Sequence, residues 1–166
     1  MSLPFFDDFS TPSLPNAEGS GFEMYHRWMD VSARRTQTFA LNAPTIGVAT
    51  LDGLDATGYP YSFVDVNTSG WCDTLTSMPL ALNGYSAESN VHLMFYVQGG
   101  GLGNAPDPFE DQLILEFKLV DDVTGEVFWT EVWSTDSVST DSFERFFVPV
   151  DQPMHLSNGF QFRFRN

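Results

Sequence analysis

The sequence predicts an all-β fold, an antiparallel β-sandwich of the jelly-roll type, because apolar and polar residues alternate with a period of two in several short segments. The clearest is residues 160–165, where phenylalanines alternate with glutamine and arginine, and residues 91–98 and 112–120 repeat the pattern. Such alternation places apolar side chains on one face of a half-buried strand. Turn-forming residues separate these segments and none has a convincing helical period, which favours a sandwich or jelly roll.

A single β-sandwich domain spanning residues 1–166 is expected from length and composition. Hydrophobic residues make up 42% of the chain, and 16 of its residues are phenylalanine. This is enough apolar material to fill a sandwich core, and it argues against disorder. The sequence contains no internal repeat and no linker that would divide it.

The N-terminal half is expected to hold four strands. They lie at residues 4–10, around Trp28 within residues 22–31, at residues 47–51 and at residues 76–82. Proline and glycine in residues 11–21 end the first strand. Pro79 makes the fourth an edge strand or a strand start, because proline donates no ladder hydrogen bond. Residues 32–45 are weakly patterned, so no strand is predicted there.

The C-terminal half carries the stronger strand signals. Strands are expected at residues 91–98, 112–120, 127–133, 145–150 and 160–165. The compact polar segment 121–126 predicts a hairpin between the second and third of these. Residues 99–106, rich in glycine, predict a long loop at one end of a sheet.

The charge of the chain excludes several classes of partner. It has 22 acidic and 7 basic residues, a formal net charge of −15 and a pI near 4.1. Nucleic acid and anionic membrane surfaces would be repelled by this field. Two interpretations stay open: solubility in a salty or extracellular setting, and carboxylates that hold a cation. No apolar run is long enough to span a membrane, so no membrane insertion is expected.

The single cysteine and the N-terminus bear on location. Cys72 excludes an intrachain disulfide, and no sequence pattern joins it to a base, so it is interpreted as passive. The N-terminus lacks the regions of a signal peptide. Residues 1–3 are interpreted as an expression start before a mature sequence that begins near Pro4, from which a signal peptide has been removed.

Most of the chain resembles a known kind of module. The segments that carry the likeness are residues 47–61, 73–80, 95–103, 111–117 and 160–166, with Trp133. They resemble the N-terminal module of large, C-terminally sorted surface proteins secreted by gliding-type bacteria. That module is similar in turn to the jelly roll of MAM and laminin-G/concanavalin-like domains. The resemblance implies a secreted or cell-surface location and a non-catalytic adhesion or recognition role, with a glycan or a protein as ligand.

Two departures from that family pattern have structural consequences. Family members carry a small residue at the position of Cys72, and they continue past Asn166 into one more strand. We therefore expect this chain to be excised from a longer protein and to lack its last strand. A missing strand leaves an unpaired sheet edge, which favours self-association.

Aspartates in two places are candidate ligands of a structural calcium ion. Asp8 follows Asp7 at the end of the first expected strand, and Asp52 and Asp55 lie in a glycine-containing loop. Calcium takes six to eight oxygen ligands from carboxylates and loop carbonyls. Similar jelly rolls often hold a structural calcium ion. The alternative is that Asp52 and Asp55 cap a turn through their side chains.

Aromatic residues suggest carbohydrate binding. Tyr59, Tyr61 and Trp71 lie in or near expected loops, where a recognition surface is usual, and they are the candidate ligand-binding residues. Trp129 and Trp133 lie four residues apart on one strand and are expected to share a face, which we interpret as core.

Catalysis has little support. A glycosidase needs two carboxylates flanking the scissile bond, and no expected strand carries two acidic residues on one face. The histidines are isolated, and no serine stands in a nucleophile motif. The chain is therefore expected not to be an enzyme; the alternatives are a sandwich-fold glycan hydrolase and a structural spacer.

Overall fold

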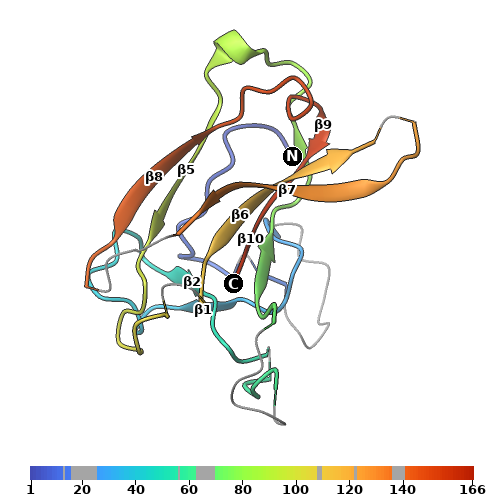
Figure 1. The fold of residues 1–166 in the computed structure, drawn as a ribbon. Coiled ribbons are helices and arrows are strands. Elements are labelled where there is room, and N and C mark those ends of the chain that lie inside the picture. Colours follow the sequence, from blue (N-terminus) through green and yellow to red (C-terminus); the bar gives the residue numbers. More distant parts are fainter. Residues whose placement is uncertain are drawn as a thin grey trace.

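The computed structural model describes residues 1–12, 14–15, 26–55, 57–62, 70–107, 110–121, 123–135 and 141–166, and this part of the chain is all-β with several antiparallel sheets (Figure 1). Its strands are β1 (Arg34–Thr36), β2 (Val48–Thr50), β3 (Thr74–Thr76), β4 (Leu80–Ala81), β5 (His92–Val97), β6 (Ile114–Val120), β7 (Val127–Ser134), β8 (Glu144–Pro149), β9 (Asn158–Phe160) and β10 (Phe162–Arg165). The short 3-10 helix η1 covers Ala87–Ser89. No helix among the described residues is long and apolar enough to cross a membrane.

The largest sheet has the strand order β3-β10-β6-β7, with every neighbouring pair antiparallel. Its inner face is apolar: Leu115, Phe117 and Phe162 are at most 2% exposed. The alternation predicted for β6 and β10 is thus confirmed. The predicted hairpin is confirmed as well, because β6 and β7 pair from Val120↔Val127 onward.

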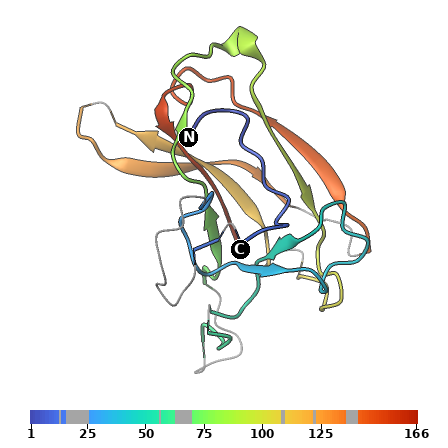
Figure 2. The ribbon, with the colours of Figure 1, turned by 180° about the vertical axis from the view of Figure 1, so that it is seen from behind.

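The sheet formed by β5 and β8 packs across this inner face (Figure 1 and, from behind, Figure 2). Phe95 of β5 contacts Phe164 and Trp133 with ring centroids 4.9 and 5.0 Å apart, and Phe146 of β8 contacts Trp133 at 4.7 Å. These contacts join two sheets through aromatic side chains, as in a sandwich. Two small sheets, β1-β2 and β4-β9, complete the described fold.

The strand predicted at residues 4–10 is wrong. The segment forms no ladder and is held by separate contacts: Gly47 N donates to the Asp8 carbonyl at 3.0 Å, and the Phe5 ring lies 5.3 Å from Trp28 and 5.5 Å from Phe162. Near Trp28 the described part shows only an isolated bridge to Ser77, while residues 22–25 of the second predicted strand lie outside the described residues.

Two predicted strands are interrupted, and one real strand was not predicted. Residues 76–82 divide into the ends of β3 and β4 on either side of Pro79. Residues 160–165 divide at Gln161, whose buried side chain donates from Nε2 to the Ser77 carbonyl at 2.8 Å. β1 lies in the weakly patterned region and forms because it pairs with β2.

A β-bulge in β7 overturns the expected placement of the two tryptophans. The register passes from Glu116↔Glu131 to Leu115↔Trp133, so Val132 is the extra residue. Trp133 therefore turns inward to Phe95, whereas Trp129 lies opposite Lys118 on the outer face. Only Trp133 belongs to the core.

Candidate functional site

The outer face of the four-stranded sheet carries a continuous row of stacked and ion-paired side chains, here called the platform. It consists of Trp71, Arg165, Glu116, Arg163 and Trp129. The Arg165 guanidinium carbon lies 3.2 Å from the centre of the Trp71 ring, and that of Arg163 lies 4.3 Å from the centre of Trp129. Both distances are within the range of cation–π stacking.

Glu116 holds the two arginines in place. Its Oε2 accepts from Arg163 Nε at 2.6 Å and its Oε1 accepts from Arg165 Nη2 at 2.8 Å. Glu116 is 4% exposed, and the arginine side chains are 24% and 18% exposed. The arginines lie two residues apart on β10, so both point to the outer face and can share one carboxylate.

The outer face around the platform holds several of the few basic residues of this acidic protein. Lys118 lies beside it and donates from Nζ to Gln161 Oε1 at 2.8 Å. Lys118, Arg163 and Arg165 are three of the 7 basic residues of the chain. Glu116 and Glu131 stand among them, so this face is close to neutral while the whole chain carries −15.

The structure places the three predicted ligand-binding aromatics on the surface. Tyr59, Tyr61 and Trp71 are 61%, 42% and 59% exposed. Trp71 belongs to the platform, while the tyrosines lie in the loop that follows β2. The outer-face position of Trp129, by contrast, was missed.

A buried carboxylate joins the tyrosine loop to the strand beside Trp71. Asp73 is 1% exposed; its Oδ1 accepts from Tyr61 Oη at 2.7 Å and its Oδ2 accepts from Asp52 N at 2.7 Å. Burial raises the pKa of Asp73, against the effect of these two donors. Burial and the Asp73 carboxylate raise the pKa of Tyr61, so its phenol stays protonated and can donate.

The predicted calcium ligands are each occupied in a local turn. Asp8 Oδ1 accepts from Ser10 Oγ at 2.6 Å, and this bond lowers the pKa of Asp8. Asp55 Oδ1 accepts from the Thr57 hydroxyl at 2.6 Å and from Tyr59 N, which lowers the pKa of Asp55.

Asp52 Oδ1 accepts from Leu54 N at 2.8 Å, so Asp52 and Asp55 both cap turns, as the alternative interpretation held. Among the residues that the structure describes, no group of three or more His, Cys, Asp or Glu side chains is placed to hold a metal ion. The calcium ion stays a prediction.

Cys72 has the environment of an unreactive thiol. It is half-buried, and burial followed by the charges of Asp73, Asp111 and Asp52 raises its pKa. A raised pKa leaves little thiolate, which is the nucleophilic form.

No expected strand carries two acidic residues on one face, but two neighbouring strands together place such a pair. Glu116 and Glu131 are register partners on β6 and β7 and lie on the same outer face. The polar turn at residues 121–126 contains the signal for this pairing: a register counted back from Val120↔Val127 brings 116 opposite 131.

Comparison of this chain with protein-family models, with curated proteins and with solved structures finds no match in any of the three. Its function is therefore argued from the platform and the surfaces around it.

Proposed function

We propose that this chain is a non-catalytic extracellular binding module whose platform holds a neutral glycan. The observation that carries the proposal is the pair of tryptophan rings on one outer sheet face, each stacked on an arginine that the same buried carboxylate binds. Of the three aromatic residues that the sequence predicts to bind a ligand, Trp71 contributes to this site.

A sugar has an apolar face of C–H groups and a rim of hydroxyls, and the platform offers surfaces for both. The Trp71 ring is 59% exposed, so the side away from Arg165 is available for stacking. Glu131 and Lys118 flank the platform with polar atoms for hydroxyls. Because the arginines are fixed by Glu116, binding requires little ordering of side chains, which favours affinity.

The charge balance supports a neutral glycan rather than a polyanionic one. The platform itself holds two arginines and one carboxylate, with Glu131 beside it, within a chain of net charge −15. A polyanionic glycan would be repelled by the surrounding surface. A neutral glycan is not repelled in this way.

The jelly-roll topology and the extracellular adhesion role belong to the same proposal. The sheet places β10 between β3 and β6, strands distant from it in the sequence, as Greek-key connections do. This topology supports a MAM/laminin-G-like module within a larger surface protein.

The cross-strand acidic pair favours a glycan hydrolase as second candidate. Residues directly opposite on neighbouring strands have Cβ atoms about 4.5–5.5 Å apart, and retaining glycosidases hold their carboxyls about 5 Å apart. However, both Glu116 oxygens accept from arginines, so neither is placed to attack a sugar or to protonate a leaving group. Binding without hydrolysis is therefore the stronger proposal.

The test is calorimetric titration with neutral and anionic glycans. Laminarin, xylan and mannan are the neutral probes, and alginate is the anionic one. Trp71→Ala and Trp129→Ala should each weaken the neutral ligand by at least about tenfold, or ~1.4 kcal/mol. Phe147→Ala is the matched control, because Phe147 is 57% exposed and also lies under an arginine, but on β8.

If Phe147→Ala weakens glycan binding equally, or if both tryptophan variants keep their affinity, the platform is not the binding site. Incubation of the bound glycan with the protein, followed by measurement of new reducing ends, separates the two candidates. Release of reducing ends that Glu131→Gln abolishes would replace the binding module with the hydrolase.

A further inference from the structure

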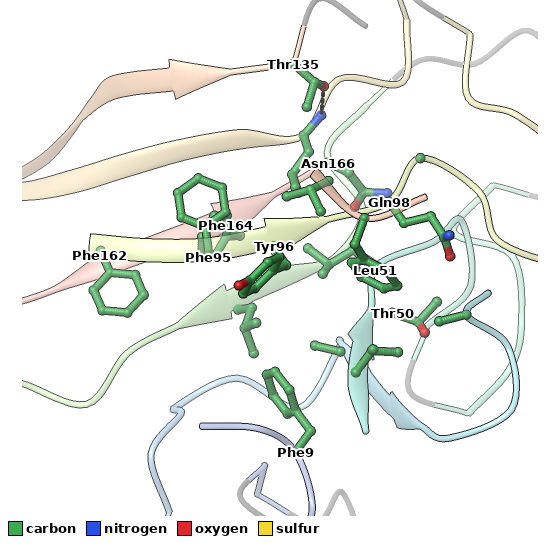
Figure 3. A pocket seen from close by; sticks show the side chains of 18 of the residues that line it. Phe9, Thr50, Leu51, Phe95, Tyr96, Gln98, Thr135, Phe162, Phe164 and Asn166 are labelled. Carbon is green, nitrogen blue, oxygen red and sulfur yellow. Dashed lines mark hydrogen bonds between the residues drawn. The ribbon is translucent and has the colours of Figure 1, made fainter. Parts of the chain in front are cut away.

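A large apolar cavity lies on the other side of the same sheet from the platform. Its volume is about 1070 Å³, at the upper end of the roughly 300–1,000 Å³ of typical ligand pockets. Phe9, Phe95, Phe162 and Phe164 line it, as Figure 3 shows, and Gln98 and Asn166 lie at its polar side. Since protein interiors are normally close-packed, a space of this size calls for an occupant.

The cavity runs along the edge of β5 rather than under one of its faces. Successive side chains of a strand point to opposite faces, yet Leu93, Met94, Phe95 and Tyr96 all border the cavity. A space that touches both sets lies beside the strand. In the described part of the chain, β5 pairs only with β8.

The opposite wall of the cavity is the N-terminal segment that lacks a ladder. Leu3, Phe5 and Phe9 line the cavity from this side. Among the described residues, no backbone hydrogen bond joins this segment to β5. Within the described residues, the outward N–H and C=O groups of β5 therefore face an apolar space, where unpaired backbone groups are costly.

We infer that this gap binds an extended peptide strand of another protein, which pairs with the edge of β5 and alternates apolar with basic residues. The side chains on one face of such a strand would fill the aromatic floor, and its backbone would satisfy β5 at ladder spacing. An aliphatic lipid could fill the same volume, but it has no donors and acceptors at that spacing. The proposal concerns a different face from the platform and does not depend on glycan binding.

The acidic residues around the cavity favour an occupant that carries basic residues. The residues that line the cavity include no lysine or arginine, but they include the carboxylates of Asp7, Asp52, Asp107, Glu110 and Asp111. Asp107, Glu110 and Asp111 are exposed and thus lie at its outer border. A strand with lysine on its outer face complements these carboxylates.

The probe is a capped synthetic peptide of alternating valine and lysine, as long as β5. Titration calorimetry measures its affinity, and hydrogen exchange measures the protection of the amides of residues 93–97. We expect binding together with at least about tenfold slower exchange in β5. A peptide of the same sequence with N-methylated backbone amides has the same charge but cannot complete the ladder, and should bind at least about tenfold more weakly.

Variants of the protein locate the site. Ala49→Phe and Leu93→Phe both place a ring in the cavity and should weaken the peptide, whereas Val123→Phe, at a residue 94% exposed and outside the cavity, should not. Two filling variants are used so that the failure of one to fold leaves the test intact.

Four results would overturn the inference. They are the absence of binding, equal affinity for the N-methylated peptide, equal affinity for a valine–glutamate peptide, and a concentration-dependent dimer with protected β5 amides. The last would make a second copy of this chain the occupant. None of them bears on the tryptophan variants, so the two proposals fail independently.

Discussion

The β5-β8 sheet and the four-stranded sheet each present an arginine above an aromatic ring, and the two arrangements differ in what fixes the arginine. On β8, Arg145 lies with its guanidinium carbon 5.1 Å from the centre of the Phe147 ring. On β10, Arg163 and Arg165 lie 4.3 and 3.2 Å from tryptophan rings and also bind Glu116. A buried anion beneath the arginines makes the difference between a single surface contact and a fixed row of stacked side chains.

The largest expected effect comes from removal of that anion. Glu116→Gln leaves two arginines without their shared carboxylate and should lower the free energy of unfolding by about 2–3 kcal/mol, less than a fully buried pair because the arginines are partly exposed. Urea denaturation measures it. The control is Glu131→Gln on the same face, which should cost under about 0.5 kcal/mol. Equal effects would mean that the two ion pairs of Glu116 contribute nothing measurable to stability.

Replacement of arginine by lysine tests the stacking itself. Arg165→Lys keeps the charge but loses the planar group above Trp71, and should cost about 1 kcal/mol. Arg145→Lys on the other sheet should change the stability by less than about 0.5 kcal/mol. Denaturation midpoints of the two variants give the comparison directly, and a reversed order would break it.

A pH titration tests the inner face of the large sheet. His155 packs against Phe117 on the inner face, and burial lowers its pKa from the ordinary value of 6.5, partly offset by the nearby charge of Asp151. Below pH 6.5 the unfolded chain takes up a proton before the folded one does. Stability should therefore fall as pH decreases from 6.5, by at most about 1.4 kcal/mol per pH unit.

His155→Phe keeps a ring beside Phe117 and should flatten this dependence. The raised pKa of Asp73 acts in the opposite sense at lower pH. Urea midpoints measured between pH 5 and 7 provide the check. An unchanged slope in the variant would assign the dependence to other groups.

Calcium is expected to have the smallest effect. Asp52 and Asp55 already accept hydrogen bonds in their turns. Calcium should therefore raise the melting temperature above that in EDTA by only about 1–2 °C, and Asp52→Asn together with Asp55→Asn should abolish the rise. If no rise occurs in the unaltered chain, the predicted ion is absent and these aspartates serve their turns alone.

Strands were predictable where period-two alternation and a turn coincide. The β6–β7 hairpin has both, and its register follows from the turn. The bulge at Val132 has no local signal in the sequence. Because of the bulge, Trp129 and Trp133 point to opposite faces of the sheet. Their spacing of four residues predicts instead a shared face, and this is why the sequence places Trp129 in the core.

The candidate site was predictable only in part, since its contacts are non-local. Trp71 could be selected as an aromatic residue near a loop, but its contact with Arg165 requires β3 and β10 to be neighbours. Residues 4–10 show the opposite error: they have the composition of a strand, and the described structure provides no ladder for them.

The place of β10 in its sheet also determines when the sheet can form during translation. β10 separates β3 from β6, and its Arg163 pairs with Thr76 on one side and with Glu116 on the other. Until Phe162–Arg165 leaves the ribosome, β3 and β6 have no strand between them and the edges that β10 joins remain unpaired. Assembly of this sheet must therefore follow translation of almost the whole described chain, and it closes long loops, which slows folding. During that interval the unpaired edges of β3 and β6 are open to pairing with other chains.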